Sequence, residues 1–528
     1  MNKLDYDYVV IGSGFGGSVS ALRLAEKGYK VLVIEKGKWF KSSDFPKTNK
    51  QIKKWIWEPK LGLKGFFKMT FLNHVTILSG VGVGGGSLTY ANTLPIPKNN
   101  FFNSGSWASL NNWKTTLNPF YKTAYKMLGA TVNPTLFEAD KSLKQVAKEI
   151  NKESKFEPTK VAVYFGEEGT TVNDPYFKGK GPNRTGCIYC GACMTGCRHN
   201  AKNSLDKNYL YFAQQLGVKI IAEKEVFNVT TLDTNDGSKG YKIEYKSSIG
   251  KKEKGNVTTK AVVFSGGVLG TVPLLLKLKE KSLPKLSNYV GKNVRTNSES
   301  LLLVTSTNKK SKDYSKGIAI GSILHTDKNS HLEAVRYGKG SSFFRILTIP
   351  YVPHKYFFGR IFGTISVLFK HPVKLLKTIF TTSYSQRTTV LLFMQTLDST
   401  LRIKLGKFTK MKTEKEEGEV PTSFIPEAIS LGKKYGELVN GLTYANFTDV
   451  LMGTPTTAHI LGGAAMGKNS TIGVIDKNCQ VFGYKNMLIC DGSMISANPG
   501  VNPSLTITAI AEYAMSKIPC KSKKEQNE

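Results

Sequence analysis

Several features are scarce in this sequence, and each scarcity narrows the class of protein that it can encode. No run of about 18 uncharged apolar residues occurs in the 528-residue chain, so we expect no membrane-spanning helix. Acidic residues are few: 39 Asp and Glu stand against 74 Lys and Arg, which gives a formal net charge of +35. Because the chain has no recognisable nucleic-acid-binding motif, this charge favours an anionic lipid surface over nucleic acid as the partner.

We also expect no secretory signal, since Met1–Asp5 lead directly into the first predicted strand. We therefore expect a cytoplasmic chain, peripheral on the membrane, with reduced thiols. The composition is otherwise that of a globular protein, with 40% hydrophobic and 21% charged residues. The length is sufficient for two domains and a large core.

The first 37 residues contain an apolar run, a glycine turn, a helix and a second apolar run that ends on a carboxylate, Glu35. Gly12 permits a tight turn, and Gly14 lets a pyrophosphate approach the N-terminus of the helix. Gly17 allows the helix to pack closely on the strand, and Glu35 can accept hydrogen bonds from ribose hydroxyls. This order and spacing predict a dinucleotide-binding unit of the kind found in NAD and FAD proteins.

Two later glycine-rich segments help to choose between these cofactors. The loop Gly80–Ser87 is interleaved with Val and flanked by apolar residues. This pattern favours burial against a large planar or phosphorylated group over a flexible linker. Val262–Gly270 has the pattern of a buried strand that enters a tight turn. No acidic strand end follows it, so it does not predict a second dinucleotide site.

Three C-terminal segments complete the pattern: His459–Gly463, Leu488–Ser493 and Gly500–Thr508. Together with the N-terminal unit, Gly82–Asn92 and Asn203–Leu210, they resemble the glucose-methanol-choline (GMC) flavin oxidoreductases, and among these the cholesterol-oxidase-like bacterial branch. The resemblance spans nearly the whole chain. It implies an α/β fold in which a Rossmann-like FAD-binding domain is interleaved with an α+β substrate-binding domain.

The resemblance also implies how the chain is divided. We expect residues 1–44, 204–300 and 470–528 to form the FAD-binding domain. Residues 45–203 and 301–469 would form the substrate-binding domain.

The resemblance implies FAD as the cofactor, with its ADP half on the N-terminal glycines and Glu35. The remaining cofactor-binding residues would be Gly84, Gly85, Gly86, Asn92, Val226, Asp491 and Gly492.

His459 would be the base that removes the hydroxyl proton as a hydride leaves carbon, because an imidazole titrates near neutral pH. The alternative for any single histidine is a core or surface position without a catalytic role. Asn502 would hold the substrate oxygen or the flavin edge. Glu333 lies in the region of the carboxylate with which sterol oxidases isomerise a steroid double bond. An ion pair between Glu333 and Arg336 is the alternative, so isomerase activity stays open.

Four of the seven cysteines fall within eleven residues: Cys187, Cys190, Cys193 and Cys197. Their spacing, C-x2-C-x2-C-x3-C, is that of bacterial ferredoxins, and it predicts a 4Fe-4S or 3Fe-4S cluster. Zinc and unliganded thiols are alternatives, although the run lacks the paired spacing of zinc ribbons. Arg198 replaces the usual proline after the fourth cysteine. Disulfides are disfavoured in a cytosolic chain.

Two segments mix large apolar residues with evenly spaced cations: Lys53–Phe71 and Ser341–Thr381. The stretch 357–369 within the second is too short to span a bilayer but suits the headgroup layer. Either segment could instead belong to the core, with its lysines extending outward. On a strongly basic chain, two such segments favour docking on an anionic membrane.

These patterns and the resemblance predict an FAD-dependent oxidase or dehydrogenase that oxidises a lipophilic secondary alcohol, a sterol being one candidate. Its electron acceptor would be oxygen, a quinone or a redox protein. A different class is also open: a membrane-surface carrier in which flavin and an iron–sulfur cluster relay electrons without alcohol turnover. A flavin monooxygenase or disulfide reductase is disfavoured, because the chain has no second full nucleotide fingerprint and because of where its cysteines lie.

Overall fold

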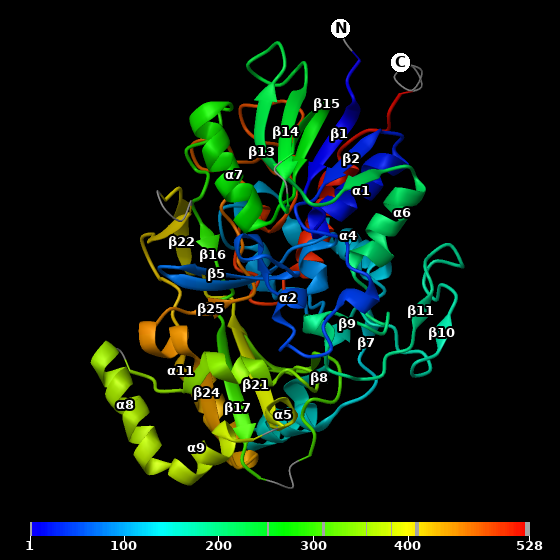
Figure 1. Cartoon of the computed structure of the whole chain (residues 1–528). Helices are drawn as coiled ribbons and strands as arrows, with labels where there is room; N and C mark the ends of the chain where they lie inside the picture. Colours follow the sequence, from blue (N-terminus) through cyan, green and yellow to red (C-terminus); the bar gives the residue numbers. More distant parts are fainter. Residues whose placement is uncertain are drawn as a thin grey trace.

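Two seven-stranded sheets form the framework of the protein, with a three-stranded sheet between them (Figure 1). The computed structural model describes residues 3–250, 253–308, 312–354, 356–381, 383–406 and 411–522, without the side chain of Phe343. Both ends of the described chain lie beside the first sheet (Figure 1). The mixed α/β fold with a Rossmann-like part, which the sequence predicts, is confirmed.

The first sheet is built around the predicted strand–helix–strand unit. Its parallel strands are β12 (Lys219–Ile221), β2 (Val31–Ile34), β1 (Tyr6–Ile11), β15 (Lys254–Phe264) and β26 (Met487–Ile489). Antiparallel strands β14 (Tyr241–Ser247) and β13 (Lys224–Thr231) extend it beyond β15. The short Val- and Ile-rich runs of β1 and β2 suit strands whose two faces are covered by helices.

Helices cover this sheet on both sides. α1 (Phe15–Glu26) connects β1 to β2 and packs against α6 (Tyr209–Gln215) and α12 (Ser504–Ser516). α12 packs in turn on α4 (Trp113–Met127). Figure 1 shows α7 (Val268–Lys281), which follows β15, on the other side of the sheet from α1.

The second sheet is antiparallel throughout. Its strands, in spatial order, are β20 (Thr348–Pro350), β24 (Gly441–Asn446), β17 (Ser300–Ser306), β21 (Thr388–Gln395), β19 (Ser330–Val335), β18 (Ile320–His325) and β8 (Phe156–Pro158). Helices α5 (Glu138–Glu149) and α11 (Pro426–Leu438) pack on one face.

Successive side chains along the strands of the second sheet point to opposite faces of the sheet, because a strand has a two-residue period. Leu332 of β19 and Leu391 of β21 join the core cluster under α5 and α11. Their neighbours Val335, Val390 and Leu392 belong to a separate cluster on the opposite face and line a cavity. Glu333 shares that face with Val335.

The three-stranded sheet contains β5 (Phe67–Leu72), β6 (Val75–Gly80) and β25 (Thr456–Thr457). β6 ends where the predicted glycine loop begins, and β25 ends two residues before His459. Because β6 and β25 pair in parallel, this sheet places the glycine loop and His459 on the same side.

The remaining described elements are mostly short. They are α2 (Ile52–Trp55), β3 (Trp57–Glu58), β4 (Leu63–Lys64), α3 (Asn99–Phe102), β7 (Thr131–Val132), β9 (Lys160–Val161), β10 (Thr171–Val172), β11 (Arg184–Thr185), β16 (Val294–Arg295), α8 (Phe357–Lys370), α9 (Pro372–Ile379), α10 (Tyr384–Arg387), β22 (Thr400–Lys404) and β23 (Lys412–Lys415). No helix in the described part of the chain is long and apolar enough to cross a bilayer.

The segment Lys53–Phe71 is a core element, which corrects its assignment to the membrane surface. Trp55 and Phe66 are fully buried and pack with Phe45, while Phe71 alone among its five aromatic residues is exposed. The alternation of Lys and aromatic residues thus reflects one buried and one solvated side.

The segment Ser341–Thr381 differs, because α8 and α9 expose most of their large apolar side chains. Its Lys355 and the side chain of Phe343 lie outside the described residues.

The strands of the first sheet all come from residues 1–44, 204–300 and 470–528. The distribution of strands supports these ranges, and we propose them for the FAD-binding domain. One element departs from the scheme, since α4 comes from residues 45–203 but packs on α12. The first domain therefore recruits a helix from the segment expected in the second.

Candidate active site

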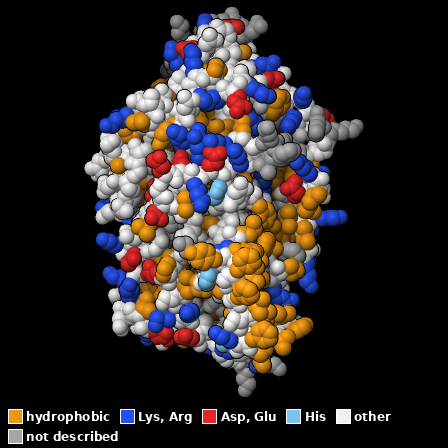
Figure 2. Space-filling view, turned by 90° about the vertical axis from the view of Figure 1, so that its left-hand side faces the viewer, with side chains coloured by type: hydrophobic (Ala, Val, Ile, Leu, Met, Phe, Trp, Pro, Cys, Tyr) orange, Lys and Arg blue, Asp and Glu red, His pale blue; other side chains and the backbone are white. Residues whose placement is uncertain are grey.

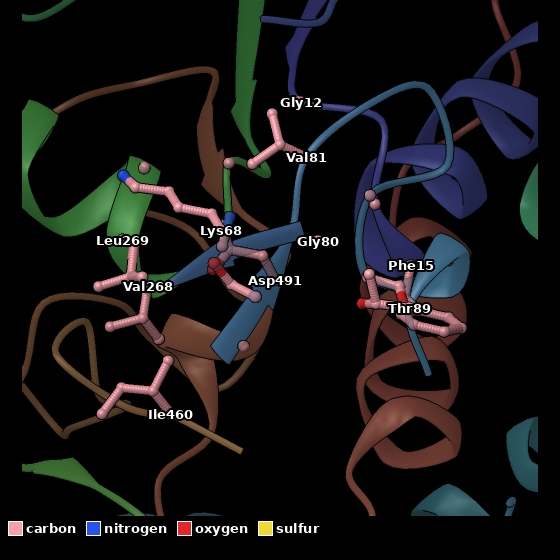
Figure 3. Close-up of a pocket in the computed structure, with 18 of the residues that line it drawn as sticks. Gly12, Phe15, Lys68, Gly80, Val81, Thr89, Val268, Leu269, Ile460 and Asp491 are labelled. Atoms are coloured by element: carbon pink, nitrogen blue, oxygen red, sulfur yellow. The ribbon is translucent and has the colours of Figure 1, made fainter. Parts of the chain in front are cut away.

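A cavity of about 490 Å³ is lined by residues of both large sheets and the small sheet between them. Its wall includes the turn after β1, the loop after β6, the turn after β15 and the segments around His459 and Asn502. Figure 3 shows Val268, Leu269 and Ile460 on one side and Phe15 and Thr89 on the other.

The turn after β1 is shaped by its glycines. A side chain at Gly12 (φ +103°) would place its Cβ 2.4 Å from the carbonyl oxygen of Ser265, and one at Gly17 would lie 2.1 Å from that of Gly12. These two positions therefore require glycine for close packing of strand and helix. At Gly14 a Cβ would meet no protein atom within 4 Å. The space beside Gly14 lies at the N-terminus of α1, where a phosphate group is favoured.

Glu35 is buried at the end of β2 and lines the cavity. It accepts hydrogen bonds from the backbone N–H of Ser13 at 3.1 Å and of Gly37 at 2.8 Å. The hydroxyl of Ser13 also donates to Glu35 at 2.7 Å and accepts from the N–H of Gly84 at 3.1 Å. This network fixes the carboxylate and still leaves it acceptor capacity toward the cavity.

The loop Gly80–Ser87 crosses directly over the first turn. Gly84 and Gly85 have φ values of +102° and +51°, and a Cβ at Gly85 would lie 2.7 Å from the Cα of Gly14. The two backbones therefore approach as closely as glycine permits. Gly85 and Gly86 line the cavity together with Val226 of β13.

Asp491 joins the C-terminal strand to the turn after β15. It accepts hydrogen bonds from the N–H of Gly267 at 2.9 Å and the hydroxyl of Thr271 at 2.5 Å. Burial raises the pKa of Asp491 above its ordinary value, while these donors and Ser493 oppose the rise. Asp491 and Gly492 line the cavity.

Asn92 is fully buried beside the cavity-lining residues Ala91 and Thr93. Its backbone has the uncommon φ of +70°. Neither polar atom of its side chain has a hydrogen-bond partner among the described residues. A buried amide left in this way costs stability unless a bound group satisfies it.

His459 lies at the cavity wall with its Nδ1 at 2.8 Å from a carboxylate oxygen of Glu299. Glu299 precedes β17 and is almost fully buried. Its second oxygen accepts from the N–H of Ala458 at 2.9 Å and from the hydroxyl of Thr457. Burial disfavours the charged imidazolium, but the carboxylate outweighs this effect and raises the pKa of His459.

Glu299 is a site residue that the sequence analysis missed. No motif surrounds it, and 160 positions separate it from His459. The pair forms only because β17 and β25 converge in the fold.

Asn502 lines the same cavity as His459, whereas the buried Glu333 lies next to Asn502 and does not itself line the cavity. The side-chain N–H of Asn502 is 3.5 Å from Glu333, and the amide oxygen of Asn502 has no partner among the described residues. Burial raises the pKa of Glu333 to about 8, against an opposing influence of His459. Glu333 is thus a carboxylic acid that stays largely protonated at neutral pH.

The alternative assignment of Glu333 to an ion pair with Arg336 is wrong. Arg336 instead contacts Asp140 of α5 at 2.7 Å, and both side chains are fully buried. The titratable neighbour of Glu333 on β19 is His331, whose Nε2 lies 3.6 Å away. This distance is too long for a hydrogen bond. Burial lowers the pKa of His331 to about 3, so this imidazole is neutral.

The predicted iron–sulfur site lacks structural support. Cys187, Cys190, Cys193 and Cys197 are free thiols, and all but Cys190 belong to an apolar cluster with Val161 and Val163. Nowhere in the described ranges are three or more His, Cys, Asp or Glu side chains grouped so that they could hold a metal ion. Burial raises the pKa of Cys193 to about 11, as expected for a thiol in apolar surroundings.

The site residues fit FAD on the observations above. Two glycine turns leave backbone open at a helix N-terminus, Glu35 offers a carboxylate, and Asn92 offers an unpaired amide. The cavity continues from these groups to His459 and Asn502. An elongated dinucleotide cofactor is therefore compatible with the whole length of the cavity.

Comparisons with known proteins agree with this geometry. Residues 6–297 and 434–511 match the N-terminal and C-terminal family models of the GMC oxidoreductases. A cholesterol oxidase of Acinetobacter baumannii is 44% identical over 537 residues, which cover 100% of this chain and 96% of the relative. A cholesterol oxidase of Mycobacterium tuberculosis is 39% identical over 540 residues, with 99% and 93% covered.

A solved structure supports the fold. Pyridoxine 4-oxidase from Mesorbium loti has a TM-score of 0.62 and 14% identity, covering 97% of this chain and 99% of that one.

Proposed function

Because the chain belongs to the GMC oxidoreductase family, whose members oxidise CH–OH groups with FAD, we propose that it oxidises a lipophilic secondary alcohol of the sterol class. The observation that carries this proposal is the position of His459 and Asn502, which line one cavity with the glycine turns and Glu35. Bound FAD supplies the acceptor for the hydride that leaves the carbinol carbon.

His459 is the proposed base. Its Nδ1 faces Glu299, so Nδ1 carries the proton and Nε2 keeps the lone pair that accepts the hydroxyl proton of the substrate. The imidazolium that forms is stabilised by the adjacent carboxylate. Glu299 thus acts through His459 as a positioning residue.

Asn502 is proposed to hold the alcohol oxygen or the cofactor edge. Its side-chain N–H already lies near Glu333, and its unpaired amide oxygen is available as an acceptor. A substrate hydroxyl can therefore be oriented between Asn502 and His459. Such orientation lowers the entropic cost of reaching the transition state.

The apolar wall and the relatives together support a lipophilic substrate. Leu301, Ile320, Val335, Val390 and Leu392 line the end of the cavity formed by the second sheet. The two bacterial relatives named above are cholesterol oxidases. A rigid hydrocarbon skeleton would gain free energy by leaving water for such a wall.

Glu333 supports double-bond isomerisation as a second step on an unsaturated product. A carboxyl group with a pKa of about 8 can give a proton to one carbon and take one from another at neutral pH. Isomerisation is proposed on this basis together with the position of Glu333 beside Asn502.

Oxygen is the proposed electron acceptor, because the two bacterial relatives reported above are named oxidases. The alternative of a flavin and iron–sulfur electron carrier loses its cluster in the described part of the chain. Peripheral attachment to an anionic membrane stays part of the proposal, on segment 341–381 alone.

Flavin reduction by a sterol tests the proposal. The wild-type holoenzyme should lose its flavin absorbance when a sterol is added without oxygen, whereas the His459→Ala variant should bind flavin but be reduced at least 100-fold more slowly. His199→Ala is the control, because His199 does not line the cavity. If sterols and long-chain alcohols leave the wild-type flavin oxidised, the proposed substrate class is wrong.

A further inference from the structure

The helices α8 and α9 form an apolar surface that few contacts with the protein cover. In α8, Arg360 is the only buried residue. The exposed apolar residues of this surface, which we call the α8–α9 surface, are Phe357, Phe358, Phe362, Ile365, Leu368, Phe369, Val373, Leu376, Ile379 and Phe380. Figure 2 shows hydrophobic side chains gathered over the lower part of this face.

This exposure is costly for a protein in water. Phe369 is 81% and Phe380 75% exposed. Contiguous exposed patches of many large apolar side chains mark interaction sites on monomeric proteins. A helix of this length gains little stability from its own hydrogen bonds, so an external apolar phase would help to keep α8 folded.

The charged residues of the segment that forms the α8–α9 surface are of one sign. No Asp or Glu occurs between Glu333 and Asp398. Lys370 and Lys377 are exposed in the last turns of α8 and α9. A second copy of this chain would bring the same positive charges together, on a protein whose net charge is already +35.

Arg360 attaches the surface to the rest of the fold. Its guanidinium donates to the carbonyl oxygens of His354 at 3.1 Å and Leu451 at 3.0 Å. Met452, next to Leu451, is itself 66% exposed. The helices are therefore held at the surface while their apolar side chains stay outside.

The inner side of α9 connects this surface to the active-site cavity. Leu375 of α9 is buried in one apolar cluster with Val335, Val390 and Leu392. These three residues also line the cavity. Through Leu375, α9 thus belongs to the same apolar cluster as the wall of the space assigned to the substrate.

We propose that the α8–α9 surface docks this enzyme on an anionic bilayer, and that α9 forms the wall through which the lipophilic alcohol passes from the bilayer to the cavity. The first part rests on the surface itself, and the second rests on the proposed function. The apolar side chains would lie among the acyl chains, and the lysines would contact lipid phosphates.

Sedimentation of the holoenzyme with vesicles tests docking without any turnover. The wild-type protein should bind weakly to vesicles of phosphatidylcholine alone. It should bind strongly to vesicles that contain phosphatidylglycerol as well. Lys370→Gln with Lys377→Gln should weaken binding to the anionic vesicles about fivefold for each lysine. The matched control is Lys53→Gln with Lys54→Gln, which removes the same charge from an exposed site elsewhere and should change binding less than about twofold.

Phe362→Ser with Phe369→Ser tests the apolar contribution, with Phe71→Ser as the exposed control. The double variant should lose most vesicle binding, whereas the control should keep it. Equal effects of the two lysine pairs, or unchanged binding of the phenylalanine variant, would overturn the proposal. A double variant that converts a dimer to a monomer in size-exclusion chromatography without losing lipid binding would assign the surface to a second copy instead.

Turnover separates docking from substrate access. The phenylalanine double variant should oxidise a sterol supplied in cyclodextrin at the wild-type rate and the same sterol in vesicles at least tenfold more slowly. Equal rates on both forms would refute the access route while leaving docking to the sedimentation result. Absence of turnover in wild type with intact vesicle binding would reject the proposed substrate and keep the docking surface.

Discussion

Replacing Glu299 by glutamine is the most informative change in the proposed catalytic pair. The substitution keeps the size of the side chain but removes the charge that faces Nδ1 of His459 at 2.8 Å. Glu299 accepts three hydrogen bonds, from His459, Ala458 and Thr457. A glutamine must turn one N–H group toward one of these donors, so both the charge and the orientation of the imidazole are affected.

The size of the effect follows from the contact. A hydrogen bond to a charged group contributes about 1.5–3 kcal/mol, and one pKa unit corresponds to about 1.4 kcal/mol. Glu299→Gln removes this stabilisation of the imidazolium and should therefore lower the pKa of His459. The base is active when neutral, so the acidic limb of kcat/KM should move to lower pH. The maximal rate should fall about 10- to 100-fold, because the base is weaker and less well oriented.

The assay is anaerobic flavin reduction by the alcohol, followed by stopped flow from pH 5 to 9. Reduction isolates the step in which the proton and hydride leave the alcohol. Glu333, with a pKa of about 8, is close enough to add a second limb at higher pH. That limb should stay in place when Glu299 is changed, which separates the two carboxyl groups.

Glu512→Gln provides the control, since this buried carboxylate pairs with Arg23 and lies away from the cavity. It should not move the acidic limb, and Glu299→Asp should restore part of the wild-type profile. An unchanged acidic limb in Glu299→Gln, in a protein that still binds flavin, would refute the assignment of Glu299 to His459. A slower rate without a pH shift would reduce Glu299 to a structural role.

Three other changes test separate parts of the structure. Gly85→Val should give protein without flavin absorbance after purification, because φ is +51° and the added Cβ would lie 2.7 Å from the Cα of Gly14. Glu333→Gln should keep alcohol oxidation within about tenfold but leave the double bond of an unsaturated ketone product unshifted, as chromatography of the product would show. Asp140→Asn should lower the free energy of unfolding by about 3–5 kcal/mol, because it leaves the buried charge of Arg336 without its partner at 2.7 Å. Denaturant unfolding measures this loss, and a change below about 1 kcal/mol would contradict it.

The parts of this protein that sequence predicted well are those set by local geometry. The turn after β1 needs glycine at Gly12 and Gly17 because backbone atoms of neighbouring segments leave no room for a Cβ. Such requirements appear in the sequence as spacing, so the nucleotide-binding unit could be read directly. His459 and Asn502 were found through resemblance, and the fold then places them in one cavity.

Long-range contacts were beyond the sequence patterns. The pairing of Glu299 with His459 depends on strands that are distant in the chain. The burial of Trp55 and Phe66 depends on Phe45 and other residues outside their own segment. A mixture of aromatic and basic residues looks the same in a buried hairpin and on a lipid surface, because only tertiary packing decides which side is covered.

The cysteine run shows a different limit. Spacing reports which side chains could meet, whereas a metal site also requires them to converge in one place. Here Cys187 and its neighbours take part in apolar packing with Val161 and Val163. A ferredoxin-like spacing is therefore compatible with a purely structural role when the backbone directs the thiols into a core.

Buried polar atoms of His331, Glu333, Asn92 and Asn502 gather without partners around the cavity, although of these residues Asn502 alone lines it. In the described part of the chain, neither imidazole nitrogen of His331 has a hydrogen-bond partner. One side-chain oxygen of Glu333, one of Asn502 and both polar side-chain atoms of Asn92 also lack a partner there. Unpaired buried groups each cost about 1–3 kcal/mol, so a cluster of them would not persist in a core that served stability alone. A cofactor and an alcohol placed among them would recover part of that cost on binding. The structure thus gives up stability at the point where the chemistry needs polar groups without partners.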